Sequence, residues 1–427
     1  MHISKLHQLF VNSKGICTDT RKIEKGTIFF ALKGDNFNGN KYAQQALNDG
    51  CDLAVVDEKE FAVNEKCILV ESVLKTLQDL ANLRRKQFNI PVIGITGSNG
   101  KTTTKELIGE VLSQKYNVLM TQGNLNNHLG VPFTLLNLNA THQIAIIEMG
   151  ANKPNDIKEL VEIAEPTHGI ITNIGTAHIE GFGSYEGVLK TKLELYDFIG
   201  RTKGHVFVNN DDKVLMSNLP NVTYSTYSTN NGADVIGELV ELTPFVNFKW
   251  KTNNYQSNII KTNLVGGYNF TNFLASICIG NYFEVPNDKI NFALSNYQPS
   301  NNRSQVTKTN RNTLIVDCYN ANPTSMQSAL ESFLMINHSN KLAVLGDMLE
   351  LGNVSEKEHQ NIVNWLNENN IETILVGKEF SKIKSKFKTF ESVQQLKDEL
   401  NLDDLNNQLI LLKGSRGIAL EKLIEEL

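Results

Sequence analysis

The chain has 427 residues and a formal net charge of −5, with 41% hydrophobic and 20% charged residues. One hydrophobic core rarely grows this large, so the length predicts two or three domains. The acidic balance argues against a nucleic-acid partner, which usually requires a basic surface. No apolar run reaches the roughly 20 residues of a membrane-spanning helix, so we expect no membrane insertion.

The N-terminal sequence MHISKLHQLFVNSKG lacks the apolar core of a secretory signal peptide. No two cysteines have CxxC spacing, and we expect reduced structural thiols rather than disulfides or a metal site. Both observations predict a cytoplasmic protein. The cysteines are Cys17, Cys51, Cys67, Cys278 and Cys318.

The first predicted domain covers residues 1–88. Apolar runs predict short strands at residues 30–34 and 52–57, and helical spacing appears at residues 42–47 and 74–88. This mixture predicts a small α/β domain.

The second predicted domain covers residues 89–298. VIGIT at residues 92–96 predicts a buried strand, and helical spacing begins at Lys101. Two further buried strands end near Gly150 and Gly175, so strands alternate with helices as in a parallel sheet. FVNFKW alternates apolar and polar residues and, with the next apolar run, predicts an antiparallel hairpin attached to that sheet.

The third predicted domain covers residues 299–427. Four apolar strands, TLIVD, KLAVLGD, ETILVG and LILLKGS, are separated by helical sequence. This alternation predicts a Rossmann-like domain, although the segment contains no GxGxxG. The fold class is therefore α/β with three domains.

The stretch GITGSNGKTTTK joins the strand at residues 92–96 to the helix that follows. A glycine-rich loop at a helix N-terminus directs backbone N–H groups and the helix dipole toward an anion. Lys101 supplies a cation for the β- and γ-phosphates, and the Thr102 hydroxyl can bind Mg²⁺.

The loop departs from the standard phosphate-loop pattern GxxxxGK[ST] at one position. Ile95 stands where that pattern has its first glycine, so the match is to the shorter GxxGKT. A simple glycine-rich turn is the alternative. The residues expected to bind nucleotide phosphates are Gly97, Ser98, Asn99, Gly100, Lys101, Thr102 and Thr103.

Further motifs follow the loop, namely GNLNNHLGVP, IEMGANKPNDI and TNIGTAHIEGFGSYEGVLKTKLEL. With the loop they make nearly the whole chain resemble the Mur ligase family, ATP-dependent enzymes that join an amino acid or peptide to a cell-wall precursor. The resemblance implies a domain for a UDP-sugar substrate, a central ATP-binding domain and a C-terminal domain that closes on ATP and an incoming dipeptide. It also implies ATP and two Mg²⁺ sites, and we expect a monomer.

By this resemblance Glu148 and His178 bind metal and act in catalysis with Lys101. A strand-end glutamate is otherwise commonly a surface residue, and a lone histidine commonly structural. Mg²⁺ prefers oxygen ligands, so chemistry alone predicts a histidine ligand less strongly.

The resemblance also implies that Lys192 is carbamylated by CO₂, acts in catalysis and helps to bind the second Mg²⁺. Lys190 is the competing position, and the spacing to Glu194 and Leu195 favours Lys192. A lysine in the charged segment KTKLELY is otherwise usually solvated.

Three more residues are expected near ATP by resemblance: Asn269 at adenine, Arg303 at the γ-phosphate and Asp317 at the ribose. Arg303 as a surface residue beside a linker is the alternative. Two positions depart from the family pattern: Tyr268 stands where many members have His, and Cys318 where a second Asp is common.

TDTR and FALKGDNFNG resemble the family's UDP-sugar-binding domain, and YNANP, LGDMLELG and KGSRG resemble one branch of the family. That branch joins UDP-N-acetylmuramoyl-tripeptide to D-alanyl-D-alanine, which are the substrates we expect. The asparagines of GNLNNHLG could instead form an ordinary turn. The residues expected near substrate are Thr20, Arg21, Gly34, Asn124, Asn126, Asn127, Asn320 and Asn322.

Two other functions compete with this hypothesis. A sister Mur ligase or a folylpolyglutamate synthetase would use the same fold with another amine donor. A P-loop regulatory protein would bind nucleotide without ligating anything, but it has no need of Glu148, His178 and Lys192 together.

Overall fold

The structure is a computed structural model that describes residues 2–175, 179–242, 244–299 and 302–427. It divides into two compact units, which are described separately. The first contains Met1–Gly94, Tyr116–Gly150 and Asp156–His168; the second contains Ile95–Lys115, Ala151–Asn155 and Gly169–Leu427.

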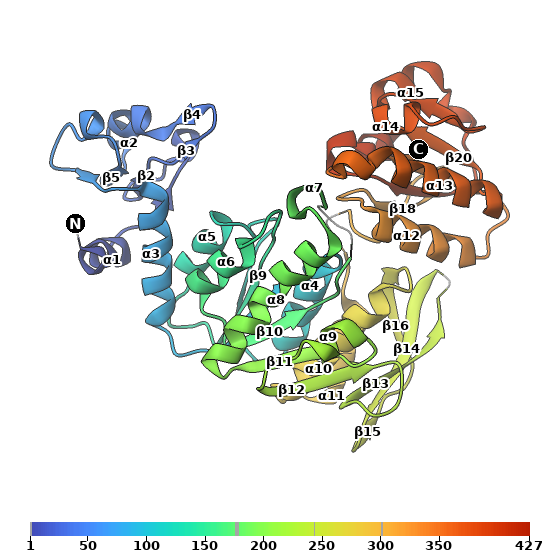
Figure 1. Ribbon diagram of the computed structural model, residues 1–427, viewed down its shortest axis with the longest axis horizontal. Helices are drawn as coiled ribbons and strands as arrows, with labels where there is room; N and C mark the ends of the chain where they lie inside the picture. The colour runs from blue at the N-terminus through green and yellow to red at the C-terminus, as the bar shows by residue number, and fades with distance from the viewer. Residues whose placement is uncertain (1, 176–178, 243, 300–301) are drawn as a thin grey trace. The chain divides into compact units, whose positions relative to one another are not determined.

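The N-terminal part of the first unit, blue in Figure 1, is built on a parallel four-stranded sheet of order β1-β2-β5-β6. Its core contains Phe29, Ala43, Ala46, Ala54 and Val56. The sheet strands are β1 Ile16–Cys17, β2 Ile28–Phe30, β5 Leu53–Val56 and β6 Cys67–Leu69, a separate hairpin is β3 Lys33–Gly34 with β4 Phe37–Asn38, and the α-helices are α1 Ile3–Val11, α2 Ala43–Asp49 and α3 Val73–Lys86.

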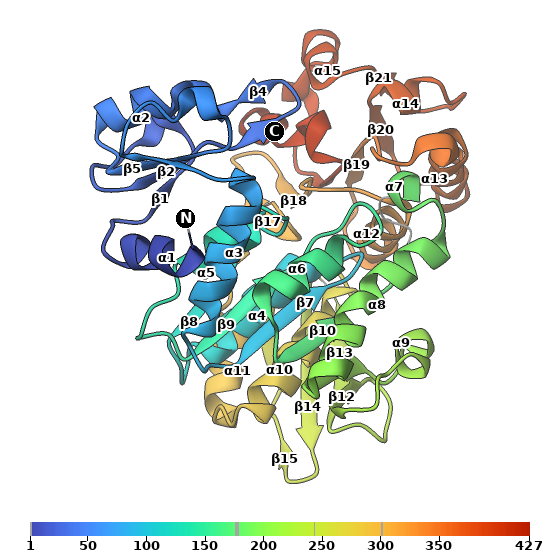
Figure 2. The ribbon, with the colours of Figure 1, turned by 60° about the vertical axis from the view of Figure 1, so that its left-hand side comes forward.

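Helix α3 packs against two further helices of the first unit, α5 (Gly130–Leu136) and α6 (Asp156–Ala164), as Figure 2 shows. Gln78 Nε2 donates to Glu159 Oε1 of α6 at 2.6 Å, and Arg84 Nη2 donates to the carbonyl of Leu138, just after α5, at 2.6 Å. α3 therefore links the N-terminal strands to the remainder of this unit.

The largest sheet has ten strands in the order β15-β14-β13-β12-β11-β10-β7-β9-β8, with β16 paired to β14. β14 pairs antiparallel with β13, β15 and β16, which confirms the predicted hairpin. Its strands are β7 Val92–Thr96, β8 Val118–Met120, β9 Ile144–Glu148, β10 His168–Ile171, β11 His205–Asn209, β12 Thr223–Ser228, β13 Val235–Glu241, β14 Phe245–Thr252, β15 Tyr255–Gln256 and β16 Ile260–Val265.

In the second unit, α10 packs against α4, α11 and the strands β11 to β14. Its buried face is unusually broad, since Phe273, Leu274 and Ile277 are all fully covered. The helices here are α4 Lys101–Leu112, α7 Ile179–Phe182, α8 Tyr185–Thr202, α9 Lys213–Ser217, α10 Asn269–Tyr282 and α11 Asn287–Asn296.

The C-terminal part of this unit, orange to red in Figure 1, has the sheet order β17-β18-β22-β19-β20-β21. Ile315 and Leu345 face a cluster with α12 and α13, whereas Leu314 and Val344 face a cluster with α15, so helices cover both faces. Its elements are β17 Gln305–Lys308, β18 Thr313–Asp317, α12 Pro323–Met335, β19 Lys341–Gly346, α13 Ser355–Asn369, β20 Thr373–Val376, α14 Lys378–Ser381, β21 Lys388–Phe390, α15 Val393–Glu399 and β22 Leu409–Lys413.

The α/β fold class is confirmed, as are the four predicted strands of the C-terminal region, to which the structure adds the edge strands β17 and β21. The domain boundaries at residues 88/89 and 298/299 stay predictions. All five cysteines are free thiols. Helices in the described ranges are all too short or too polar to cross a lipid bilayer.

Candidate functional site

The glycine loop after β7 has a backbone that only glycine fits. Gly97 has φ 145° and Gly100 has φ 78°, both in the left-handed region. A Cβ on Gly97 would lie 2.0 Å from Thr172 Oγ1. The backbone of the loop is thus free to approach a ligand closely.

Residues that follow β10 hold this loop in place. Asn99 N donates to Asn173 Oδ1 at 3.0 Å, and Asn173 Nδ2 and Thr172 Oγ1 donate to the Asn99 carbonyl at 3.0 and 2.6 Å. Sequence reasoning assigned no role to Thr172 or Asn173. Their position directly after a parallel strand could have identified them, because the carboxyl ends of parallel strands lie at one edge of the sheet.

The N-terminus of α4 begins at a glycine. Gly100 is its N-cap residue and provides no side-chain cap. Lys101 Nζ donates to the carbonyls of Gly97 and Ser98 at 2.7 and 3.2 Å, and Thr102 is buried beside it. A helix N-terminus without a side-chain cap, its dipole and an ammonium group together suit phosphate.

A chain of buried amides leads from α4 to α10. Thr104 Oγ1 donates to Asn272 Oδ1 at 3.1 Å, and Asn272 Nδ2 donates to Asn269 Oδ1 at 2.9 Å. Asn269 is 1% exposed, and its Nδ2 donates to the Val265 carbonyl and to Ser304 Oγ. The residue expected at adenine is therefore bonded within the protein.

Residues of the C-terminal part form a second group. Lys413 is 2% exposed, and its Nζ forms an ion pair with Asp317 Oδ2 at 2.9 Å and donates to the Asn320 carbonyl at 2.9 Å. The Arg303 guanidinium carbon lies 3.8 Å from the centre of the Tyr319 ring. Neither Lys413 nor Tyr319 had been given a role from the sequence, although KGSRG and YNANP contain them.

Asn322 joins this group to the glycine loop. Its Nδ2 donates to Asn99 Oδ1 at 2.7 Å, and its Oδ1 accepts from Ser325 N at 2.9 Å as the cap of α12. Asn320 is exposed, and its Oδ1 accepts from Ala321 N. Of these two asparagines expected near substrate, Asn320 is thus the accessible one.

Glu148, in the first unit, ends β9 and is 1% exposed. Asn126 Nδ2 donates to its Oε1 at 2.8 Å, and its N–H donates to Thr121 Oγ1 at 3.0 Å. Asn127 Oδ1 accepts from the N–H groups of Leu129 and Gly130, and Asn124 is exposed. The asparagine cluster therefore includes one residue that orients Glu148 and one that supports the start of α5.

Lys192 lies in the middle of α8 and is 2% exposed, with Nζ 5.6 Å from the centre of the Phe182 ring. Lys190 on the same helix is exposed. Of these two lysines of α8, the buried one is therefore Lys192. His178 lies outside the described residues.

Of the substrate residues predicted in the N-terminal sheet region, Arg21 is exposed and binds Asp19 in a bidentate ion pair at 2.8 and 2.9 Å. Hydrogen bonds from Arg21 lower the pKa of Asp19 to about 2. Thr20 begins the same 3₁₀ turn, and Gly34 lies on β3 with open space around its Cα.

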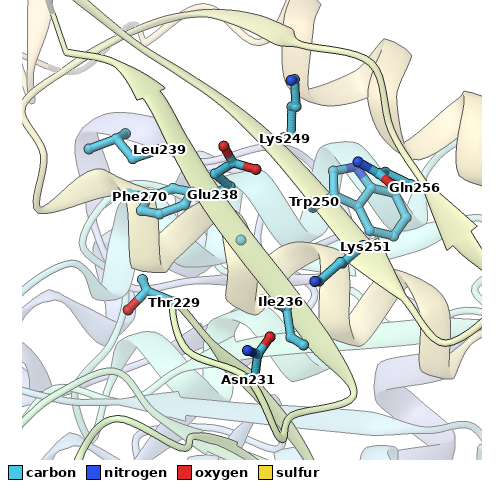
Figure 3. A pocket seen from close by; sticks show the side chains of 11 residues that line it. Thr229, Asn231, Ile236, Glu238, Leu239, Lys249, Trp250, Lys251, Gln256 and Phe270 are labelled. Carbon is cyan, nitrogen blue, oxygen red and sulfur yellow. The ribbon is translucent and has the colours of Figure 1, made fainter.

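A cavity of about 490 Å³ lies along β13 and β14 (Figure 3). None of the predicted site residues lines it, although Phe270 follows Asn269 directly. Within the described parts of the chain, no three His, Cys, Asp or Glu side chains are close enough to hold a metal ion. The expected Mg²⁺ ligands Thr102 and Lys192 are of other types.

Comparisons with known proteins cover nearly the whole chain. Residues 12–85, 95–280 and 302–416 match, in turn, the catalytic domain of the Mur ligase family, the Mur ligase middle domain and the Mur ligase glutamate ligase domain. UDP-N-acetylmuramoyl-tripeptide--D-alanyl-D-alanine ligase of Bacillus subtilis (strain 168) is 33% identical, with 97% of this chain and 93% of the relative covered. The chain belongs to the Mur ligase family.

Other Mur ligases agree with this assignment. The enzyme of the same name from Escherichia coli (strain K12) is 32% identical over 96% of this chain and 93% of its own length. A crystal structure of MurF from Acinetobacter baumannii has a TM-score of 0.88 and 30% identity, covering 99% of this chain and 97% of that one. MurF from Thermotoga maritima in complex with ADP has a TM-score of 0.86 and 27% identity, with 98% and 97% covered. The predicted family is confirmed.

Proposed function

We infer that this Mur ligase is an ATP-dependent ligase that adds D-alanyl-D-alanine to UDP-N-acetylmuramoyl-tripeptide, releasing ADP and phosphate. The observation that carries this function is full-length similarity to ligases of that name, joined to a glycine-capped α4 N-terminus beside Lys101. Such a helix end suits the phosphates of ATP.

The chemistry proceeds in two steps. A carboxylate oxygen of the tripeptide attacks the γ-phosphorus of ATP, the bond to the β,γ-bridging oxygen breaks, and ADP leaves. The dipeptide amine then attacks the acyl carbon, loses a proton, and the bond between that carbon and the phosphate oxygen breaks. Phosphoryl transfer depends mainly on positioning and charge stabilisation.

We propose the following roles for this chain's residues. The loop residues 97–100 and the first turn of α4 bind the phosphates, with Lys101 neutralising charge on the β- and γ-phosphates. Arg303 acts on the γ-phosphate, and its buried Nε has no hydrogen-bond partner within the described chain, as suits a group that binds a ligand. Asp317, fixed by Lys413, serves the ribose.

Mg²⁺ would be held by Thr102, Glu148, His178 and modified Lys192, and when bound it supplies charge neutralisation on the phosphates. The hydroxyl of Thr102 and the carboxylate of Glu148 are oxygen donors of the type that Mg²⁺ prefers. The bond from Asn126 keeps one carboxylate oxygen of Glu148 in a fixed orientation.

We propose that Lys192 carries a carbamate, formed when its neutral amine adds to CO₂ and releases a proton. Burial on α8 supports this, because it disfavours the protonated amine. A Lys192→Ala variant should lose turnover and recover part of it with short-chain carboxylates. Unchanged turnover would remove Lys192 from the mechanism.

The cytoplasmic location and the monomeric state stay predictions. Analytical sedimentation tests the monomeric state.

The reaction is tested by trapping the acyl phosphate with hydroxylamine, which should give a hydroxamate of the UDP-linked tripeptide. ADP release should require both the UDP-tripeptide and D-alanyl-D-alanine. Equal ADP release with a single amino acid would indicate a sister ligase. If no hydroxamate forms and no labelled carboxylate oxygen is transferred to phosphate, the protein would instead be a regulatory nucleotide-binding protein.

A further inference from the structure

The backbone on both sides of Arg303 is in a conformation that side-chain-bearing residues seldom adopt. Asn302 has φ 56° and Ser304 has φ 52°, and neither is glycine. Left-handed backbone is unfavourable for serine in particular, and two such residues around one arginine persist only where neighbouring groups hold them. The contacts of this turn therefore decide where Arg303 points.

Ser304 is the held residue on one side. It is 3% exposed, and its Oγ accepts from Asn269 Nδ2 at 3.1 Å and shares a hydrogen bond of 2.8 Å with the Tyr268 hydroxyl. On the other side, the Asn302 carbonyl accepts from Cys318 N at 3.1 Å. The turn is thus fastened to the start of α10 and to the end of β18.

Tyr268 has little freedom to move. A Cβ on Gly266 would lie 2.5 Å from the Tyr268 ring, so the ring packs directly on that backbone. Burial, and then the negative charge of Asp317, raise the pKa of Tyr268 well above its usual value. The phenol therefore keeps its proton and remains a hydrogen-bond donor at neutral pH.

The Arg303 side chain leaves this turn and lies across Tyr319, 3.8 Å from the ring centre. The ring supports one face of the guanidinium, so the aim of the side chain depends on the backbone position of residue 303 relative to that ring. Loosening Ser304 would release the turn while leaving Arg303 itself intact.

We propose that Tyr268 is a positioning residue for Arg303, acting through Ser304 to hold the left-handed turn that aims the guanidinium. This inference rests on the proposed role of Arg303 in phosphoryl transfer. It gives a function to a tyrosine at a position where many family members have histidine. Phenylalanine would keep the packing on Gly266 but lose the bond to Ser304.

The test is a double-mutant cycle with Tyr268→Phe and Arg303→Ala in the full-length chain, measuring kcat, KM for ATP and thermal stability. Tyr268→Phe should lower kcat about ten-fold, because small misplacements of a catalytic group carry large costs, with KM for ATP changed less than about two-fold. In the Arg303→Ala background it should lower kcat no further. Tyr255→Phe is the matched control, since it removes another phenol hydroxyl, one that accepts from Asn291 Nδ2 at 2.8 Å.

Each outcome decides one of the two claims. Arg303→Ala with wild-type kcat overturns the proposed role of Arg303 and this inference with it. Arg303→Ala impaired and Tyr268→Phe unchanged overturns only the positioning role. Equal losses from Tyr268→Phe in both backgrounds show a general structural effect and also overturn it. Should Tyr268→Phe fail to fold, Ser304→Gly, which keeps the left-handed backbone without the hydroxyl, must show the same dependence on Arg303.

Discussion

Two strand-to-helix junctions of the second unit end in opposite ways. After β7, Gly100 stands at the N-cap of α4 and offers no side chain to the first turn. After β18, Asn322 caps α12 in a reciprocal pair with Ser325, and proline follows it. The first junction is called open because its N-cap residue offers no capping side chain, whereas the second is closed by its own reciprocal cap.

At two other helix N-termini of the chain a carboxylate accepts hydrogen bonds from the first turn. Asp57 accepts from Val73 N, the first residue of α3, at 3.2 Å. Asp347 accepts from the N–H groups of Glu379 and Phe380 in α14 at 2.8 and 2.9 Å. In both cases the chain's own carboxylate occupies the position that a phosphate would take.

The largest expected effect is loss of the cation at the open junction. Lys101→Ala should lower kcat/KM about 10²- to 10³-fold, because it removes a charge that stabilises the transferring phosphoryl group. Thermal unfolding should be nearly unchanged. Lys190→Ala, an exposed lysine, is the control, and comparable losses in both variants would contradict a special role for Lys101.

The second effect concerns the glycine backbone of the open junction. Gly97→Ala should destabilise the protein by about 3 kcal/mol, since it combines a left-handed φ with a 2.0 Å clash against Thr172. Gly232→Ala has φ 95° but nothing within 4 Å, so it should cost only about 1 kcal/mol. Urea unfolding measures both. Equal costs would mean that the clash is relieved by movement.

The third effect tests the closed junction. Asn322→Ala should destabilise the protein by about 1 kcal/mol through the lost cap. It should also lower activity several-fold, because the bond to Asn99 in the glycine loop is lost. Ser392→Ala removes the cap of α15 alone, so it should match the stability loss and keep full activity. Full activity in both variants would exclude a functional link between the junctions.

The smallest effect concerns the carboxylate at α3. Burial alone would raise the pKa of Asp57, but hydrogen bonds from Lys33, Asn40 and Val73 N lower it below its ordinary value. Because the pKa of Asp57 is lower in the folded than in the unfolded state, its ionised carboxylate adds to the free energy of unfolding. This contribution is fully present above the unfolded-state pKa, near pH 4, and is lost as the pH falls through the folded-state pKa.

Asp57→Asn should therefore cost about 0.5 to 1 kcal/mol at pH 7 and progressively less as the pH falls below 4. Unfolding by urea across this pH range measures the difference. Asp52→Asn, an exposed aspartate beside the same sheet, should show no such trend. A constant cost at all pH values would show that the charge of Asp57 contributes nothing.

Sequence alone determined the strand at residues 92–96, the glycine loop and the helix that follows, because these features are local. Strand length, glycine placement and helical periodicity all act within about a dozen residues. It also favoured Lys192 over Lys190, and the structure buries Lys192 and exposes Lys190. Most strands of the C-terminal sheet were predicted for the same reason, whereas the edge strands β17 and β21 carry weaker apolar patterns.

Only the tertiary structure decided which side chains meet. Asn322 Nδ2 donates to Asn99 Oδ1 across 223 positions of sequence. Lys413 Nζ donates to the backbone carbonyl of Asp317 across 96 positions. Strand order, not sequence distance, brings these groups together, since β18 pairs with β22 in the sheet. The turn around Arg303 is a further case, because its backbone is held against local preference by Tyr268 and Asn269. Local patterns describe what each segment prefers, and distant contacts decide where a segment departs from that preference.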